Sequence, residues 1–455
     1  MRGSAFLVVA LACSLASPCL AYEDAQGSTQ SDPGANASAL QAIQNQIRSL
    51  KAEYEKRIKD LEEQVAALQA QMLRGAAEAA PAAAAQAAPP PMPLIPGALN
   101  PAMTVVGSFL GRGDSQRIYN EDGARIDNRM TLRETELDLR AAIDPYADGV
   151  FIASIASETP GQYSASVEEA YVTIKKLPFQ AQAPLGLKLK VGRFRPSFGT
   201  NNILHTHDLP QSTRPLPVQE FMGEEGFAQS GISGDFFIPT PWDRQSSLDA
   251  TLQVMAGGDL AMSPDIGART AYLGHLRWFR SFGSTQNLGI GWSSYLHPAG
   301  NGVRRADFHG VDFMYRWKPL RLGQWRSFLV SGELMFARHA NPEVPMAADT
   351  EPDPNGGVSE RKSPLGFTVF GQWQLNRRLY AGARWDRTNV VYDTSLVRRS
   401  VTPYFSYYFS EFLRFRLNYE RRWSDLPGEH RRSSVFAELN FVFGSHPPEP
   451  FWVNK

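Results

Sequence analysis

The sequence is poor in cysteine, in net charge and in long apolar runs, and each absence excludes a class of protein. Of 455 residues only Cys13 and Cys19 are cysteines, so neither a disulfide framework nor a cysteine-ligated metal site is expected. Basic and acidic residues both number 46, which removes the polybasic surface of a nucleic-acid binder. After the N-terminal segment, charges, glycine or proline interrupt every apolar stretch before it reaches the roughly 18 residues of a membrane-spanning helix.

The N-terminal segment has the pattern of a secretory signal peptide. Arg2 supplies a positive charge, residues 5–15 are apolar, and Cys19-Leu20-Ala21 offers a cleavage site with a small residue. We therefore expect residues 1–21 to be removed together with both cysteines. Acylation of Cys13, as in a lipoprotein, is the alternative. An exported chain without a membrane-spanning helix is periplasmic, secreted or an outer-membrane β-barrel.

A heptad pattern follows residues 22–38, which we expect to be disordered. Residues 39–74 carry apolar side chains three and four apart between charged flanks, at Leu40, Ile43, Ile47, Leu50, Tyr54, Ile58, Leu61, Val65, Leu68 and Met72. The spacing predicts a coiled coil with a stutter at Tyr54, and its isoleucines favour three or more strands. A lone amphipathic helix on the barrel or on peptidoglycan is the alternative. Residues 75–98 are nearly all alanine and proline and predict a linker.

Residues 99–443 alternate apolar and polar side chains in short segments. In one segment Leu413, Phe415 and Leu417 are separated by Arg414 and Arg416. One face of such a strand suits lipid and the other suits water. The pattern predicts approximate strands at 103–111, 130–143, 148–157, 167–176, 186–194, 230–238, 246–256, 269–279, 286–296, 306–317, 326–337, 364–375, 378–388, 399–409, 411–422 and 433–443.

These segments predict an all-β transmembrane barrel of about 16 antiparallel strands, preceded by the α-helical coiled coil. An even number in this range is typical of single-chain bacterial barrels that enclose an aqueous channel. Aromatic residues at strand ends suit the two membrane interfaces: Trp278, Trp292, Trp317, Trp373, Trp385, Tyr407, Phe409 and Phe443. Tight reversals at 376–377 and 410 contrast with long polar stretches at 112–128, 341–363 and 423–432, as short periplasmic turns and longer outer loops would.

One stretch, residues 195–230, breaks the strand rhythm with several prolines and charges of both signs. A loop of this length is usually functional or disordered, and in a channel it would fold into the lumen and narrow the pore. The candidate constriction residues are Arg193, Arg195, His205, His207, Asp208, Arg214, Glu224 and Glu225. Candidates for the lumen face of the strands are Asp138, Arg140, Arg277, Asp312, Arg316, Arg384, Asp386, Arg414, Arg416 and Glu438. The mixture of signs predicts weak selectivity for small hydrophilic solutes.

The stretch 192–199, Gly-Arg-Phe-Arg-Pro-Ser-Phe-Gly, resembles a motif of the phosphate-selective porin O/P family of outer-membrane channels. It follows Val167-Glu168-Glu169-Ala170-Tyr171-Val172 and precedes Gly223-Glu224-Glu225-Gly226 and Gly231, so the resemblance covers about sixty residues. The resemblance implies a sixteen-stranded homotrimeric porin in outer-membrane lipid. Such a porin would pass small hydrophilic solutes or ions, including anions such as phosphate. Two features depart from the family: a Pro-rich tail at 444–455, and the lack of a recognisable run of basic loop residues.

Enzymatic interpretations have little support in the sequence, which contains no G-x-S-x-G, H-E-x-x-H or phosphate-binding glycine loop. His205-Thr206-His207-Asp208 has the residue types of a zinc or copper site, yet paired histidines in a loop are more often ordinary loop residues. The Arg-Gly-Asp string at 112–114 is too short to indicate adhesion. We therefore expect a porin without cofactor, metal or enzymatic activity. The alternatives are a coiled-coil envelope tether anchored by the barrel, and an outer-membrane hydrolase.

Overall fold

The computed structural model describes residues 101–454 except 121–122, 158, 178, 181, 259, 264–269, 299–304, 341–361, 427–428, 430 and 446–449. The predicted signal peptide, the 22–38 segment, the coiled coil and the Ala/Pro linker lie outside the described residues. Most of the long connection predicted at 341–363 lies outside them as well. Within the described residues, no helix is long and apolar enough to cross a membrane.

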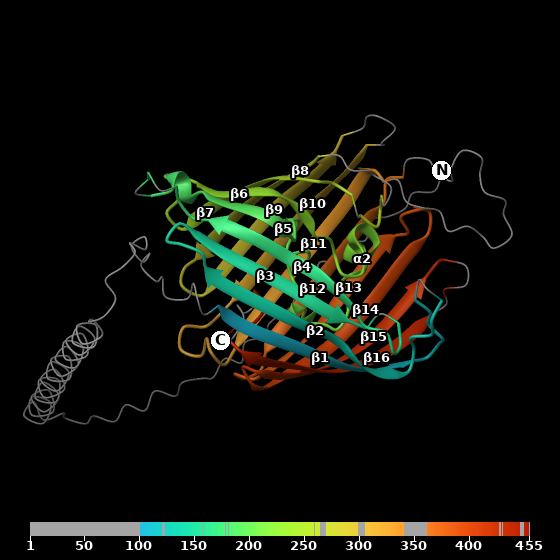
Figure 1. Ribbon diagram of the computed structural model, residues 1–455. Coiled ribbons are helices and arrows are strands. Elements are labelled where there is room, and N and C mark those ends of the chain that lie inside the picture. Colours follow the sequence, from blue (N-terminus) through green and yellow to red (C-terminus); the bar gives the residue numbers. More distant parts are fainter. Residues whose placement is uncertain are drawn as a thin grey trace, which may run out of the picture. The chain divides into compact units, whose positions relative to one another are not determined.

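The described residues form a closed barrel of antiparallel strands (Figure 1). Each strand pairs with its sequence neighbours, and β1 closes the cylinder by pairing with β16. The strands are β1 Ala102–Asp114, β2 Arg129–Ala142, β3 Ala147–Ala156, β4 Ser164–Ile174, β5 Lys188–Phe194, β6 Gln229–Ile238, β7 Ser246–Met255, β8 Ala271–Phe282, β9 Gln286–His297, β10 Ala306–Trp317, β11 Ser327–His339, β12 Leu365–Gln374, β13 Leu379–Asn389, β14 Val397–Ser410, β15 Leu413–Ser424 and β16 Arg432–Gly444.

The predicted sixteen-stranded antiparallel barrel is confirmed, and most strand boundaries agree within a few residues. The larger differences occur where pairing is irregular. The register of β3 with β4 shifts between Ile152 and Ala153, beside the adjacent acids Glu168 and Glu169. A bulge places two residues of one strand against one of its partner and breaks the two-residue period. The alternation therefore places the start of β4 later than Ser164, where pairing begins.

The two faces of the barrel wall have opposite chemistry. Large apolar side chains such as Leu252 and Phe443 are more than half exposed on the outside. Charged side chains such as Asp386, Arg416 and Glu438 are fully buried on the inside. This order is the reverse of a water-soluble barrel and is what a barrel surrounded by lipid requires.

The connections between strands alternate between two ends of the barrel. One end holds short turns such as 375–378 and 411–412, together with the start of β1 and the end of β16, and is called here the short-turn end. The long-loop end holds longer connections, including 115–128 and 195–228. Outer-membrane barrels place their short turns in the periplasm, and the same asymmetry is present here.

Candidate functional site

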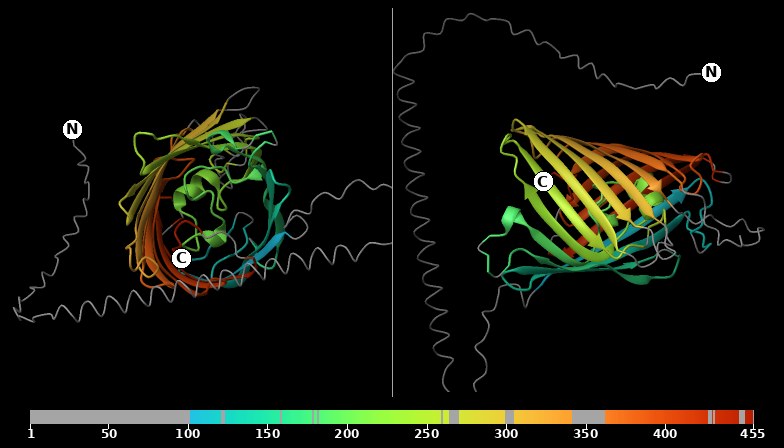
Figure 2. Two further views of the ribbon diagram at one scale, coloured as in Figure 1. Left: turned by 90° about the vertical axis from the view of Figure 1, so that its left-hand side faces the viewer. Right: turned by 90° about the horizontal axis from the view of Figure 1, so that it is seen from above.

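Residues 195–228, called here the lumen loop, connect β5 to β6 and lie inside the barrel. Figure 2 shows the loop and its helix within the ring of strands. The loop contains a 3₁₀ turn, η2 Thr206–Asp208, and one short helix, α2 Leu216–Met222. Its hydrogen-bond partners come from strands on several sides of the barrel, so it crosses the interior.

Two glycines and one glutamate direct the chain from β5 into the interior. Gly192 has a φ of 138°, and a side chain there would collide with the Ala170 carbonyl on β4. Gly199 has a φ of 59°, and a Cβ there would lie 2.6 Å from the Glu333 carboxylate of β11. That carboxylate accepts hydrogen bonds from the backbone amide of Asn201, at 2.7 Å, and from the amide and hydroxyl of Thr200. These contacts explain both glycines of the 192–199 motif.

Asn202 joins the two ends of the lumen loop. Its amide nitrogen donates to the carbonyls of Pro196, at 2.9 Å, and Phe227, at 3.2 Å. Its side-chain oxygen accepts from the Phe227 backbone amide at 2.9 Å. Asn202 is fully buried, so these bonds form away from water and hold the base of the loop closed.

An apolar cluster fixes α2 and the base of the loop to one side of the wall. Phe198 stacks on Phe308 of β10 with ring centroids 4.3 Å apart. The other buried members include Phe194, Val218, Phe221, Met222, Phe227, Tyr295 and Met335. Apolar burial anchors this half of the loop, which explains how an irregular segment is held within a wet interior.

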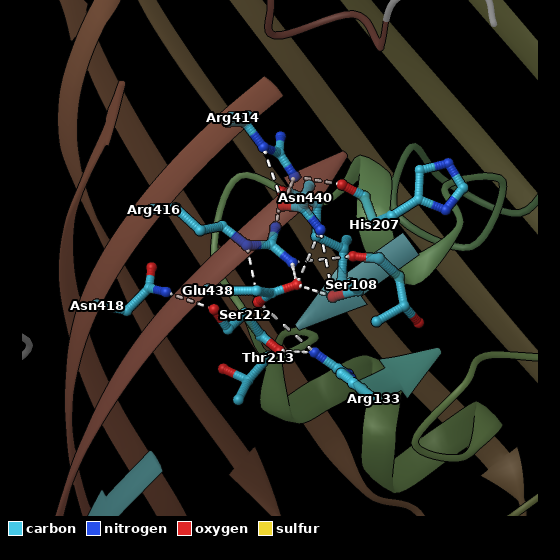
Figure 3. A network of polar contacts seen from close by, with 12 residues as sticks. Ser108, Arg133, His207, Ser212, Thr213, Arg414, Arg416, Asn418, Glu438 and Asn440 are labelled. Atoms are coloured by element: carbon cyan, nitrogen blue, oxygen red, sulfur yellow. Dashed lines mark hydrogen bonds and ion pairs between the residues drawn. The ribbon is translucent and has the colours of Figure 1, made fainter. Parts of the chain in front are cut away.

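On another side, arginines of the wall bind backbone carbonyls of the loop (Figure 3). Arg133 donates to the Ser212 carbonyl at 2.6 Å, and Arg384 donates to the Thr213 carbonyl at 2.5 Å. Arg414 and Arg416 donate to the carbonyls of His207 and Leu209. A guanidinium group offers five donors in a fixed plane and so can bind carbonyl and carboxylate groups together.

Glu438 neutralises the most buried of these arginines. Its carboxylate lies 2.6 Å from Arg416, and neither side chain is exposed. Ser108 donates a further hydrogen bond to Glu438 at 2.5 Å, and Arg133 lies 4.0 Å away. The pair therefore ties β15 and β16 to the middle of the lumen loop.

His205 and His207 lie against an acidic part of the wall. The Nδ1 atoms of His205 and His207 lie 3.1 and 3.5 Å from one oxygen of Glu136 on β2. His205 Nε2 lies 3.4 Å from Glu169 on β4, and the two imidazole rings are stacked 5.8 Å apart. Burial lowers the pKa of His205, but Glu136 and Glu169 outweigh it and raise the pKa to about 10. His205 is therefore a cation that pairs with wall carboxylates at neutral pH.

Arg195 and Arg214 stabilise the loop from within. Arg195 lies 2.5 Å from Glu168 of β4 and donates to the Glu225 carbonyl at 2.6 Å. Arg214 donates to the carbonyls of Asn201 and Leu204 at 2.9 and 2.5 Å. Burial and then the nearby charge of Arg195 lower the pKa of Arg214 to about 9.

The predicted constriction residues divide between the loop and its surroundings. Five of them, Arg195, His205, His207, Asp208 and Arg214, lie in the loop. The contacts of four are given above, and the carboxylate of the fifth, Asp208, lies 3.4 Å from His207 Nε2. Glu224 and Glu225 are both exposed, and Glu225 accepts a hydrogen bond from Thr206 at 2.6 Å. Arg193 is a correction, because it belongs to β5 and not to the loop. It pairs across strands with Ala170, and its guanidinium is exposed beside the Val167 carbonyl, on the face opposite Phe194.

The predicted lumen residues occupy inner positions of their strands. Asp138 and Arg140 form an ion pair of 2.8 Å on β2, and Asp386 pairs with Arg384 at 2.9 Å on β13. The remaining members, Arg277, Asp312, Arg316, Arg414, Arg416 and Glu438, alternate with outward apolar residues on β8, β10, β15 and β16. Most of these charges are therefore paired with one another or with the loop.

Sequence reasoning missed the groups that receive the loop. Glu333 and Glu168 of the wall were not named as site residues, although Glu333 is an acid at an inward position of β11 and Glu168 stands in the stretch quoted for the resemblance. Asn202, within the loop, was not named either. The tail after β16 was also missed, since Trp452 is 1% exposed inside the barrel. The adjacent aromatic residues Phe451 and Trp452 in this Pro-rich tail were the available sequence signal that it is buried. Within the described residues, no group of three or more His, Cys, Asp or Glu side chains is arranged to hold a metal ion.

Comparison with known proteins gives a distant relative and structural neighbours. No family model matches the chain. An uncharacterized protein of Aquifex aeolicus (strain VF5) is 23% identical over 362 residues, which are 73% of this chain and 72% of that protein. The outer membrane channel DcaP of Acinetobacter baumannii aligns with a TM-score of 0.50 and 10% identity, over 75% of this chain and 97% of its own. The anion-selective porin from Comamonas acidovorans aligns with a TM-score of 0.47 and 9% identity, over 76% and 100%.

Identity this low supports a conclusion about fold alone. The alignment with DcaP spans nearly all of that channel and the barrel of this chain. Together with the strand order and the outward apolar face, it shows that the chain has the barrel fold of an outer-membrane channel.

Proposed function

We propose that the barrel is a porin in the outer membrane, which passes small hydrophilic solutes or ions by passive diffusion. The observation that carries this proposal is the inversion of the wall, with apolar side chains outside and paired charges inside around an inward loop. A barrel of this strand number is wide enough to leave an aqueous channel, and an aqueous channel across a membrane conducts.

The selectivity we propose is weak. A ring of one charge repels ions of the same sign and attracts ions of the opposite sign, but the inner wall here carries Glu136 and Glu169 as well as Arg384 and Arg416. Pairing with the loop removes much of the net field of these charges. Anions such as phosphate are the first solutes to test, because the 192–199 motif resembles that of the phosphate-selective porins.

The chain organisation we propose is a cleaved signal peptide, a periplasmic coiled coil, a linker and the barrel. β1 begins at the short-turn end, which outer-membrane barrels direct toward the periplasm. A homotrimer is proposed from the family resemblance together with the isoleucine-rich heptads. The coiled coil would then also be free to contact peptidoglycan or a periplasmic partner.

Planar-bilayer recording tests this function. Purified protein should insert from detergent and produce discrete conductance steps, and a KCl gradient should give a small reversal potential. Protein that stays soluble without detergent, or that inserts without conducting, would rule out the proposal. A large reversal potential of either sign would retain the channel and overturn the weak selectivity.

A further inference from the structure

The chain after β16 turns back into the barrel. β16 ends with Gly444 at the short-turn end, and residues 450–454, called here the tail segment, lie against the inner wall (Figure 2). Trp452, Val453 and Asn454 are all buried. A segment beyond the last strand is not needed to close the barrel, so its placement requires a separate explanation.

We propose that the tail segment is a second constriction of the channel, on the short-turn side of the lumen loop and bound to it. The proposal rests on the proposed channel function, and it assigns a permeation role to residues outside the barrel strands. Solute passing the lumen loop would then meet the tail before leaving the barrel.

Hydrogen bonds to several strands fix the backbone of the tail segment. Gln372 of β12 donates to the Trp452 carbonyl at 2.8 Å, and Tyr380 of β13 donates to the Asn454 carbonyl at 2.9 Å. Arg316 of β10 donates to the Phe451 carbonyl. The donors come from three strands, so side chains of the wall hold the tail through its backbone carbonyls.

The Asn454 side chain adds a contact to the turn between β10 and β11. Its amide nitrogen donates to the Gly323 carbonyl at 2.6 Å and to the Gln374 side chain at 2.5 Å. Gly323 belongs to a turn of the short-turn end, so this contact places the tail near that mouth of the barrel.

Trp452 connects the tail segment to the lumen loop. Its indole Nε1 donates to the Asp208 carbonyl at 2.6 Å. The Trp452 and Tyr380 rings pack in a T-shaped arrangement with centroids 6.2 Å apart. The Arg414 guanidinium lies 5.3 Å from the centroid of the Trp452 ring. Arg414 also donates to the His207 carbonyl, so one arginine contacts both the tail and the loop.

The wall beneath the tail is suited to a covering segment. It presents an apolar and aromatic inner surface, made by Met314, Leu329, Phe370, Tyr380, Tyr404 and Tyr408. This surface is separate from the apolar cluster that α2 and the base of the lumen loop cover. Apolar surface in a wet lumen is costly, and the rings and side chains of residues 451–453 cover it. The tail and this surface therefore form one packed unit.

The test compares single-channel conductance of the full chain, a chain ending at Ser445, and Trp452→Ala. Removing the tail should raise conductance by about twofold or more, because a constriction dominates the resistance of a pore. Trp452→Ala should raise it by a smaller amount and increase current noise. Trp373→Ala is the matched control, because Trp373 neighbours Gln372 and Gln374 on β12 but is exposed on the outer face; it should leave conductance unchanged.

Heat-modifiable migration in gels identifies folded barrels before recording. If the shortened chain does not fold, Trp452→Ala and its control decide the question. Wild-type conductance in every folded variant would overturn the second constriction while leaving the channel intact. A full-length chain that never conducts would instead overturn the proposed function.

Discussion

Arg416 shows how single residues of the wall act on the lumen loop. Its guanidinium binds Glu438 on one side and the Leu209 carbonyl on the other, and it is fully buried. Breaking a buried ion pair by removing one partner leaves an uncompensated charge. The role of such an arginine is therefore to hold the loop, and its charge is largely unavailable to a passing solute.

Replacing Arg416 with methionine should destabilise the barrel by about 3 to 5 kcal/mol, because the buried Glu438 carboxylate loses its cation and the Leu209 carbonyl loses a donor. Urea unfolding in lipid vesicles measures this loss. Arg193→Met is the control, because the hydrogen bond from Arg193 on β5 to the Val167 carbonyl is exposed, and a change of this kind should cost only about 0.5 kcal/mol. Similar losses in both variants would contradict the buried pair.

His205 predicts a pH dependence of stability. Its pKa rises from an ordinary value of 6.5 to about 10 in the folded chain, through Glu136 and Glu169 and against burial and Arg195. A raised pKa means that the protonated group stabilises the fold. The contribution is complete below about pH 6.5, declines as the pH rises, and is lost above about pH 10.

His205→Gln provides the measurement. The difference in unfolding free energy between wild type and this variant should be largest near pH 6.5 and should approach zero by about pH 10. Glutamine keeps hydrogen-bonding capacity but cannot take the charge, so the change with pH isolates the proton. A difference that stays constant from pH 6.5 to 10.5 would show that His205 is not a cation in the folded loop.

At the scale of elements, the lumen loop depends on two kinds of anchor. Apolar packing of α2 and Phe198 fixes one part, and arginine-to-carbonyl bonds fix another. Asn202 joins the two ends of the loop between them. The loop is therefore held both at its base and at residues 207–213. Under the proposed function, this anchoring keeps the opening between the loop and the wall constant, as a channel with steady conductance requires.

Asn202→Ala should loosen the base of the loop and give noisier, more variable open currents. The substitution leaves the buried amide of Phe227 without its partner and removes one donor each from the carbonyls of Pro196 and Phe227, at a cost of about 1 to 3 kcal/mol. Planar-bilayer recording detects the noise. Asn376→Ala, in an exposed turn at 375–378, serves as control and should conduct like wild type.

At the scale of the whole molecule, the heptads predict the state of association. Native electrophoresis of a chain lacking residues 22–96 should show fewer trimers than the chain that retains them, since the predicted coiled coil would add association energy. Ile47→Lys, at a seam position, should act in the same direction. Glu62→Lys, on the charged flank, should have little effect. Unchanged oligomers in the shortened chain would show that the barrel alone carries the association.

The sequence by itself determined the barrel, because a strand between lipid and water must alternate apolar and polar side chains, and this period is visible in 413–420 and its counterparts. It also placed residues 195–230 apart from the strands, since prolines and clustered charges cannot continue the alternation. Alternation predicts whether a side chain faces lipid or the barrel interior. It does not predict which residue that side chain contacts across the interior.

Only the tertiary structure decided those partners. Glu136, Glu169 and Glu333 receive parts of the lumen loop that lie far from them in sequence, and long-range pairing of this kind leaves no local pattern. Arg193 was named among the constriction residues, yet strand pairing continues to Phe194 and holds Arg193 in β5. Trp452 reaches Asp208 for the same physical reason, because closing the cylinder brings residues 244 positions apart within hydrogen-bond distance.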